Sequence, residues 1–497
     1  MKLFIFLILV LSVNLVYGQK ETKALRKGNI HLDDNKYEDA LIDYQEAYRF
    51  NSENSLLNYK IGLCYYFTDL DSLAKISFEK AFSLDRKVAE DIHFYIARCN
   101  HLTCNFEKAI ANYSIELDFA LNNDRPDYAR ALQKFITECR SGIKLLMEQG
   151  SLTVVRNLNQ PVNSAFPEYA PSVSKDDSKL FYTSRGNENQ GTGNPDGIFY
   201  ALKSDSSWNK AFNIGGPVNS SYIDAVLGIS IDAKVLYLYA YENKGDIFFS
   251  QFSGTGWSEP EPFSYAINSR FTESSLCFTS NEDTLFFTSD RAGSVGGKDI
   301  YYSVKENDEW QTPVNIGDEI NTEYDEESVF LFEDTLFFAS RGHNSMGGFD
   351  IFKTFQKRDG SWNEPENLGF PVNSPYDDLY FTASDSNTYF ASERRGGNGK
   401  SDIYSIVILP PPYVYIRPDS IIRKAVRFYA ISSILFELNS SHNEDAYPSI
   451  DILIGFLHSE PGVKVLITGY TDTQGDHNYN MIAPCKTVRW GFMANKY

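Results

Sequence analysis

An Asp-Ile pair recurs at regular intervals through the middle of the chain, and an arginine recurs at the end of an apolar run in most copies. Carboxylates at such positions can bind a metal or a ligand, or they can accept hydrogen bonds from backbone N–H groups in a turn. The repeated aspartates are Asp196, Asp246, Asp299, Asp350 and Asp402, and the repeated arginines are Arg185, Arg291, Arg341 and Arg394. Because a catalytic group is needed only once, this repetition favours a structural role. A ligand or metal in a central channel is the alternative.

No group of residues with catalytic spacing is evident. The histidines are scattered, and the chain contains no His-Glu-x-x-His, no Gly-x-Ser-x-Gly and no phosphate-binding loop. Adjacent carboxylates such as Glu326–Glu327 and Asp377–Asp378 are frequent in an acidic chain, and we interpret them as solvated surface groups. The sequence therefore predicts a protein that is not an enzyme and that has no catalytic residues, no cofactor and no metal site.

Composition narrows the class of protein further. The chain has 497 residues, a net charge of −20 and 15% aromatic residues. Its length suggests about three domains, and the aromatic content disfavours disorder. A chain this acidic is not expected to bind nucleic acid or an anionic membrane through its overall charge.

The first residues have the pattern of a secretory signal peptide. A basic Lys2 precedes the apolar run Leu3–Val13. Val16 and Gly18 then stand at positions −3 and −1 of the expected cleavage site, where such residues are small or tolerated. We therefore expect residues 1–18 to be removed before Gln19. No later stretch reaches the roughly 18 apolar residues that a membrane helix needs, so the mature chain is expected in the periplasm, associated with the outer membrane and without a transmembrane segment.

Residues 19–150 contain a repeat of 34 or 35 residues. Gly28 and Gly62 are 34 residues apart, and so are Tyr44 and Phe78. The pattern resembles the tetratricopeptide repeat, a pair of antiparallel helices, and a last helix near residues 128–148 is expected to cap the stack. The resemblance implies binding of a peptide or a partner protein, and a role as a spacer is the alternative.

Cysteines are sparse, with six in the whole chain and no Cys-x-x-Cys motif. Cys64 and Cys99 fall on equivalent helix positions of the repeat, and we expect them to be buried thiols. Export permits disulfides, so a bridge between Cys99 and Cys104 is the alternative.

Residues 151–409 contain a second repeat, of about 50 residues. Four tryptophans mark it with spacings of 49, 53 and 52 residues, at Trp208, Trp257, Trp310 and Trp362. An Asn-Ser or Asn-Thr pair also recurs, at Asn163, Asn219, Asn268, Asn321 and Asn373. Each copy contains about four short strands separated by turn residues, which is typical of a propeller blade. These motifs resemble the TolB-like, WD-type propeller repeats of bacterial envelope proteins, and we predict five blades.

The ends of this region predict how the ring closes. The fifth copy lacks the fourth strand, and a matching segment stands at the front of the region, at residues 153–164. This first segment is expected to complete the last blade beside Asp402–Ile406, which leaves few free strand edges. In the third copy, strands are expected at residues 274–278, 284–289, 299–304 and 310–316.

The last part of the chain begins with a stiff proline linker at residues 410–413. Residues 414–497 then show a β-α-β order with Gly-x-Thr-Asp after the second strand, which resembles the OmpA-like C-terminal domain. The resemblance implies that Thr471 and Asp472 contact the diaminopimelate of peptidoglycan. Thr487 stands where the family has arginine, and Pro484 would break the following helix. We therefore expect a partial domain that binds peptidoglycan weakly or not at all.

The predicted fold class is multidomain: an all-α helical repeat, then an all-β five-bladed propeller, then a partial α/β OmpA-like domain. This order is similar to that of envelope proteins of Bacteroidetes-type bacteria, some of them associated with type IX secretion. We interpret the chain as a non-catalytic periplasmic scaffold or adaptor whose partners are envelope proteins and, through its degenerate last module, peptidoglycan. The alternative is a propeller-based sensor that binds a small molecule, a glycan or a peptide.

Overall fold

The computed structural model describes residues 22–148, 153–186, 196–204, 207–220, 223–241 and 245–408. The predicted signal peptide and the predictions for residues 410–497, including Thr471 and Asp472, lie outside these residues. Within them, no helix has both the length and the apolar character needed to cross a membrane.

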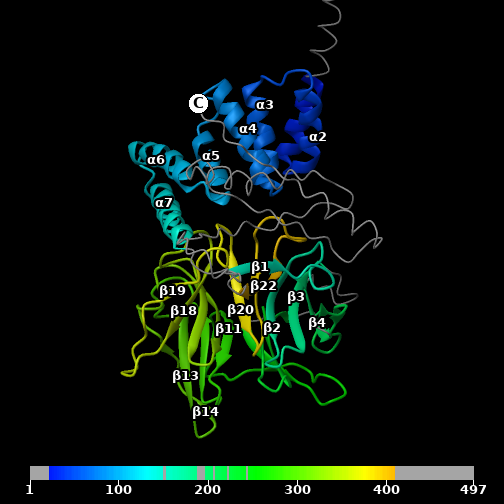
Figure 1. Ribbon diagram of the computed structural model, residues 1–497, viewed down its shortest axis with the longest axis vertical. Helices are drawn as coiled ribbons and strands as arrows, with labels where there is room; N and C mark the ends of the chain where they lie inside the picture. Colours follow the sequence, from blue (N-terminus) through cyan, green and yellow to red (C-terminus); the bar gives the residue numbers. More distant parts are fainter. Residues whose placement is uncertain are drawn as a thin grey trace, which may run out of the picture. The chain divides into compact units, whose positions relative to one another are not determined.

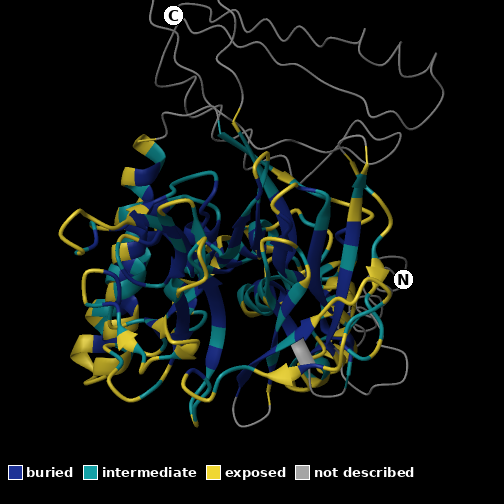
Figure 2. Cartoon of the chain, turned by 90° about the horizontal axis from the view of Figure 1, so that it is seen from below, coloured by how far each residue is buried: buried dark blue, intermediate teal, exposed yellow. Residues whose placement is uncertain are grey.

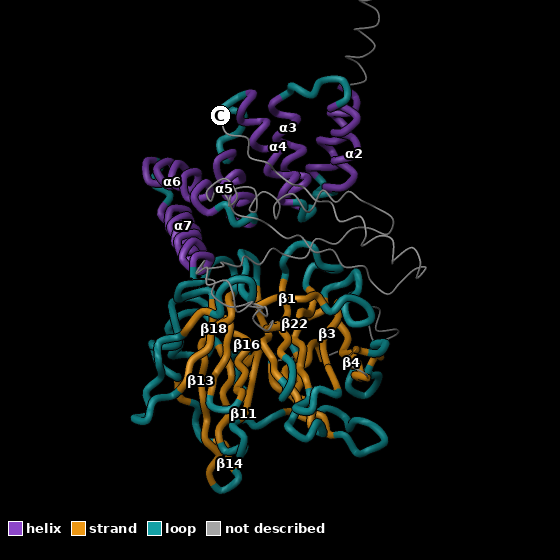
Figure 3. The backbone as a smooth tube through the Cα atoms, viewed as in Figure 1, coloured by secondary structure: helices purple, strands orange, loops and turns teal. Residues whose placement is uncertain are grey.

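The helical region consists of antiparallel pairs, as the 34-residue repeat predicts (Figures 1 and 3). A first helix covers residues 22–33. The others are α2 (Tyr37–Tyr48), α3 (Ser55–Phe67), α4 (Asp71–Leu84), α5 (Ile92–Leu102), α6 (Phe106–Asn122) and α7 (Pro126–Met147). Helices within a pair approach closely at glycine, since a Cβ on Gly62 would lie 2.7 Å from the Phe78 ring. The resemblance to the tetratricopeptide repeat is therefore confirmed at the level of the fold.

Helix α7 caps the stack, as the sequence predicts. It starts with Pro126, whose missing N–H costs nothing in the first turn of a helix. Its buried side chains, among them Leu132 and Cys139, pack in one cluster with residues of α5 and α6. Cys64 and Cys99 are buried free thiols, and Cys104 is also unpaired, so the alternative disulfide does not form.

Five antiparallel sheets follow the helices and form the blades of a propeller, which confirms the predicted fold class for this region (Figure 1). The first blade contains β2 (Glu168–Val173), β3 (Lys179–Arg185), β4 (Asp196–Ser204), β5 (Ser207–Trp208) and β6 (Phe212–Asn213). The second contains β7 (Ile223–Ile229), β8 (Val235–Ala240), β9 (Asp246–Gln251) and β10 (Glu261–Pro262). In Figure 2 the blade strands are drawn mainly in the buried colour, whereas many connecting turns are exposed.

The remaining blades repeat this order. The third contains β11 (Glu273–Phe278), β12 (Thr284–Ser289), β13 (Asp299–Glu306), β14 (Glu309–Trp310) and β15 (Val314–Asn315). The fourth contains β16 (Glu326–Phe332), β17 (Thr335–Ser340), β18 (Asp350–Phe355) and β19 (Glu366–Asn367). The fifth contains β20 (Asp378–Ala383), β21 (Thr388–Ser392), β22 (Asp402–Ile408) and β1 (Thr153–Asn157).

The fifth blade confirms the predicted closure of the ring. Its outer strand is β1, which pairs antiparallel with β22 from Thr153 opposite Ile408 to Asn157 opposite Tyr404. Beyond the strand, the N–H of Leu158 donates to the carbonyl of Ile403 at 3.0 Å. The two ends of the propeller region are therefore held together by backbone hydrogen bonds.

The predicted fourth strand of the third blade is wrong in its extent. The sequence predicts one strand over residues 310–316, but the structure has two short strands there. Trp310 in β14 pairs with Lys305, whereas Val314 in β15 pairs with Tyr302 farther along β13. Pro313, which has no N–H to donate, lies between the two pieces.

Residues of the helical repeat also contact the propeller. The hydroxyl of Tyr376 donates to Asp71 at 2.7 Å, and Arg395 pairs with the same carboxylate at 2.8 Å. His101 is fully buried, and its Nε2 lies 2.9 Å from the carbonyl oxygen of Met346. Burial lowers the pKa of His101 to about 3, so the ring is neutral at neutral pH and its Nε2–H donates this hydrogen bond. Met346 itself packs in the cluster of α5, α6 and α7.

Candidate functional site

The repeated aspartates hold the turn that precedes the third strand of a blade. Asp299 accepts hydrogen bonds from the N–H groups of Val295 and Gly296 at 2.7 and 3.2 Å. Asp402 accepts in the same way from Asn398 and Gly399 at 2.5 and 3.0 Å. These contacts are those expected for the structural interpretation, which is therefore confirmed for these two aspartates.

The repeated arginines pair with carboxylates, again as the structural interpretation predicts. Arg291 pairs with Glu273 at 2.9 Å and Arg394 with Asp378 at 2.6 Å, and in both cases the carboxylate is fully buried. The other two arginines form pairs of different geometry, Arg185 with Asp196 and Arg341 with Asp377. Within the described residues, no group of three or more His, Cys, Asp or Glu side chains has the geometry of a metal site.

The interpretation of the adjacent carboxylates as solvated is wrong for one member of each pair. Glu326 and Asp378 are completely buried, because each begins the innermost strand of a blade and points into it. The carboxylate of Glu326 accepts hydrogen bonds from the N–H and hydroxyl of Thr322 and from the hydroxyl of Ser340, at 2.7–2.9 Å. The threonine or serine of the repeated Asn-Ser/Thr pair thus serves as a partner for a buried acid.

Glu326 predicts a pH dependence of stability. Burial raises its pKa from 4.5 to about 7, against the opposing effect of its hydrogen bonds to Ser340 and Thr322. Because the folded pKa lies above the unfolded pKa, the contribution of this group to stability is greatest at low pH and is lost as the pH rises from about 4.5 to about 7. We expect Glu326→Gln to remove this loss. The free energy of unfolding of the variant minus that of wild type should therefore increase by about 2 kcal/mol from pH 5 to pH 8.

Urea unfolding at the two pH values measures this gain. The matched control is Glu323→Gln, which makes the same change on an exposed side chain three positions away, and its difference from wild type should be independent of pH. A constant difference between Glu326→Gln and wild type would show that Glu326 is ionised in the folded protein at pH 5.

Five buried or half-buried asparagines fix the segment between two blades to the third strand of the preceding blade, and the sequence did not reveal this role. The Oδ1 of Asn321 accepts from the N–H of Ile300 at 2.8 Å, and its Nδ2 donates to the carbonyl of the same residue at 3.0 Å. The other asparagines form the same pair of bonds, with the isoleucine that follows the repeated aspartate: Asn163 with Ile403, Asn219 with Ile198, Asn268 with Ile247, and Asn373 with Ile351. We call these five contacts the amide clamps.

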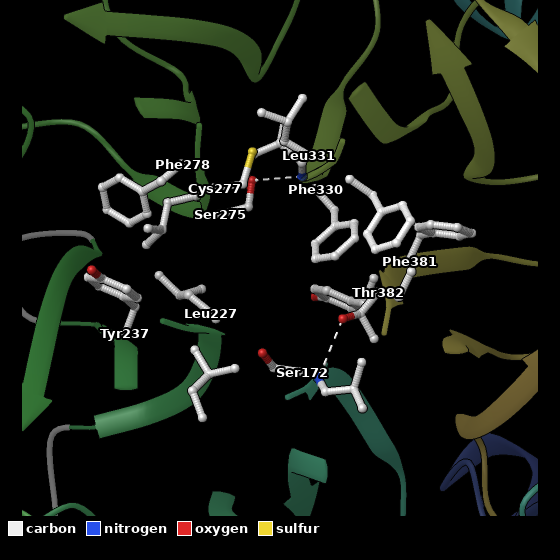
Figure 4. A pocket seen from close by; sticks show the side chains of 18 of the residues that line it. Ser172, Leu227, Tyr237, Ser275, Cys277, Phe278, Phe330, Leu331, Phe381 and Thr382 are labelled. Atoms are coloured by element: carbon white, nitrogen blue, oxygen red, sulfur yellow. Dashed lines mark hydrogen bonds between the residues drawn. The ribbon is translucent and has the colours of Figure 1, made fainter. Parts of the chain in front are cut away.

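A cavity of about 440 Å³ lies in the channel of the propeller. The innermost strands of all five blades, β2, β7, β11, β16 and β20, contribute to its wall. Large apolar side chains surround the open centre in Figure 4, namely Leu227, Tyr237, Phe278, Phe330, Leu331 and Phe381. Each inner strand has a bulge in its pairing with the second strand, and a bulge changes the direction of the side chains beside it.

Two of the hydroxyls in this wall are bonded to the protein itself. The hydroxyl of Ser275 accepts from the N–H of Val329 at 3.3 Å, and that of Thr382 accepts from the N–H of Val173 at 3.4 Å. Both bonds join neighbouring blades, whereas the hydroxyl of Ser328, also in the wall, is buried without a hydrogen-bond partner among the described residues. The carboxylates that line the cavity are those of Glu282, Glu333 and Asp385, and they stand on the exposed turns that follow the inner strands.

A second candidate surface is formed by the first helix of each helical pair. Tyr66 and Tyr95 contact edge to face with ring centroids 5.2 Å apart, and the hydroxyl of Tyr59 donates to Asp91 at 2.7 Å. Lys60 donates to the side chain of Asn29 at 2.6 Å. We call Tyr59, Lys60, Tyr66, Tyr95 and Arg98 the helical face. All five are half-buried, so they present mixed aromatic and cationic groups.

The described chain thus combines a tetratricopeptide-like helical repeat with a five-bladed propeller. No family model matches the chain, and no curated protein matches it. Among solved structures, the TPR domain of Arabidopsis OM64 is 17% identical, with 24% of this chain and 96% of that domain covered and a TM-score of 0.22. TolB from Agrobacterium tumefaciens is 15% identical, with coverages of 52% and 98% and a TM-score of 0.29. An alpha-L-arabinofuranosidase from Lactobacillus brevis is 12% identical, with coverages of 50% and 92% and a TM-score of 0.34.

Proposed function

We propose that the chain is a non-catalytic scaffold or adaptor of the bacterial outer envelope that binds partner proteins through its helical repeat and propeller. The observation that carries this proposal is the helical face, where aromatic rings and the cations of Lys60 and Arg98 are partly accessible. Aromatic and arginine side chains are enriched among the residues that dominate protein interfaces. The opposite charge of a partner segment would complement the two cations.

The location in the periplasm and the association with the outer membrane belong to the same proposal, and they rest on the signal-peptide pattern of residues 1–18. Envelope proteins are then the expected partners. Contact with peptidoglycan through Thr471 and Asp472 is expected to be weak or absent, because Thr487 cannot supply the cation that a ligand carboxylate needs.

Absence of catalysis is proposed from the distribution of charged groups. Glycoside hydrolysis uses two carboxylates that flank the scissile bond. In the described channel the carboxylates that line the cavity stand on the turns at the mouth. Two of the repeated aspartates, Asp299 and Asp402, are occupied in turns, and two of the arginines, Arg291 and Arg394, in buried ion pairs.

Partner capture from envelope extracts of the source bacterium tests the scaffold proposal. The mature chain is compared with the double variant Lys60→Ala/Tyr66→Ala, which removes one cation and one ring from the helical face. We expect recovery of the specific partners, quantified by mass spectrometry, to fall at least about tenfold, as for the loss of an interface hot spot.

The matched control is Ile42→Ala/Ile76→Ala, which truncates two exposed side chains on the second helices of two pairs, 67% and 60% accessible. Its recovery should equal that of wild type. Equal recovery by all three proteins would contradict binding through the helical face, provided that thermal unfolding shows the variants to be folded.

A second candidate function is that of a sensor, in which the propeller binds a small molecule, a glycan or a peptide. The cavity of about 440 Å³ favours it, because small-molecule sites are concave, mostly apolar and about 300–1,000 Å³ in volume.

A further inference from the structure

The chemistry of the channel cavity restricts what it can bind. Its wall is formed by aliphatic and aromatic side chains from several blades, and the hydroxyls of Ser275 and Thr382 are engaged with backbone N–H groups. A polar ligand body, such as a sugar ring, would replace only a few of the hydrogen bonds to water that it loses here, which costs free energy. We therefore expect the body of a ligand that enters this cavity to be mainly apolar, with the unpaired hydroxyl of Ser328 available for one polar contact.

The mouth of the cavity adds a requirement for charge. Four charged side chains line it: Glu282, Glu333 and Asp385 are acidic, and Lys175 is basic. In the part of the chain that the structure describes, none of these four side chains forms an ion pair. The excess of carboxylates gives the mouth a negative potential, and low-dielectric walls concentrate such a field at an opening.

Turn geometry places two of these carboxylates in equivalent positions. Glu282 and Glu333 both have left-handed backbone conformations, with φ of 56° and 52°, in the turns that join the first two strands of the third and fourth blades. The third carboxylate belongs to the fifth blade, where the N–H of Asp385 donates to the carbonyl of Lys175 at 2.9 Å. The acidic groups are thus contributed by three neighbouring blades around one opening.

We propose that the propeller channel binds small organic cations with an apolar body, such as aromatic amines, with the body against Leu227, Phe330 and Phe381 and the cationic group at the acidic mouth. The volume of about 440 Å³ has room for an indole-sized body. This inference develops the sensor function. Its failure would leave the scaffold proposal intact, because the helical face and the channel share no residue.

Three indoles of similar shape and different charge test the proposal on the mature chain. Tryptamine is a cation at pH 7, 3-methylindole is neutral and indole-3-acetate is an anion. We expect isothermal titration calorimetry to give the tightest binding for tryptamine, with a Kd at least about tenfold below that of indole-3-acetate, and an intermediate value for 3-methylindole. Equal affinities for the three compounds, or binding of none of them, would overturn the proposal.

Gly228 offers a way to fill the cavity. It lines the channel, and a Cβ at this position would meet nothing closer than the carbonyl oxygen of Leu276 at 3.8 Å. We expect Gly228→Phe to abolish the binding of tryptamine. The matched control is Gly256→Phe, at a glycine outside the channel whose Cβ would have no neighbour within 4 Å, and it should bind tryptamine as wild type does. Unchanged binding by a folded Gly228→Phe would place the site elsewhere and refute the proposal.

Glu282→Gln/Glu333→Gln tests the charge requirement without altering the cavity. Both side chains are exposed, so the variant is expected to fold. Tryptamine should bind at least about fivefold more weakly than to wild type, whereas the affinity for 3-methylindole should not change. An equal loss for both compounds, or no loss for tryptamine, would contradict recognition of the cation by the mouth.

Discussion

Replacing Arg156 by proline is expected to lower the free energy of unfolding by about 3 kcal/mol, because it breaks the closure of the propeller ring. Arg156 lies opposite Ser405 in the pairing of β1 with β22. Since the N–H of Leu158 points to Ile403, and alternate residues of a strand direct their N–H groups to the same side, the N–H of Arg156 also faces β22. Proline removes this donor and places its ring against β22.

Urea unfolding followed by tryptophan fluorescence measures the loss. Arg156→Ala is the matched control, because the side chain is exposed and its removal leaves the backbone donor in place. The control should lie within about 0.5 kcal/mol of wild type. Similar stabilities of the proline and alanine variants would mean that pairing of β1 with β22 contributes little to the stability of the ring.

Loss of one amide clamp should be as damaging. We expect Asn321→Leu to destabilise the propeller by about 3 kcal/mol, although leucine keeps the number and branching of the side-chain heavy atoms. Asn321 is 1% exposed and supplies the acceptor for the N–H of Ile300. Leucine leaves this N–H buried without an acceptor, and it also removes the donor to the carbonyl of Ile300 and the bond to Asn315.

Hydrogen exchange gives a local readout for this variant. The amide of Ile300 should lose its protection in Asn321→Leu, while amides of the first blade keep theirs. The control Asn281→Leu makes the same change on an exposed turn and should alter the stability by less than about 0.5 kcal/mol. Protection of Ile300 that survives in Asn321→Leu would show that another group replaces the clamp.

Repetition made both modules predictable from the sequence. In the helical repeat, Gly28 and Tyr44 recur after 34 residues as Gly62 and Phe78, since each small residue has to accommodate the ring of the paired helix. In the propeller, the surplus segment at residues 153–164 and the missing strand of the fifth copy together predicted the closure. The architecture of a repeat can be read from the sequence because every copy must form the same contacts, and the residues that form them therefore recur.

Contacts that depend on register were not predictable in the same way. The recurring asparagines were visible in the sequence, but their bonding partners lie in another strand. One signal could have revealed these partners. Each clamp asparagine follows its isoleucine at a constant spacing of 21 or 22 residues, as for Ile198, Ile247, Ile300 and Ile351. Burial of Glu326 depends on which face of its strand turns inward. The channel cavity is formed by five segments whose bulges break the simple alternation of side chains.

Closure of the ring by β1 also constrains the order in which the strands can pair during synthesis. β1 is the first strand of the propeller to be synthesised, and its partner β22 is the last. Asn157 of β1 bonds to Asp402 of β22 at 2.8 Å across 245 residues of sequence, and β1 can pair only after β22 has been synthesised. Blades formed in between depend on shorter-range pairing and can fold first, since closing a longer loop costs more entropy. Before β22 is available, β1 is an unpaired edge strand that could pair with another chain. The first strand therefore cannot be fully paired before the chain has been synthesised as far as Ile408.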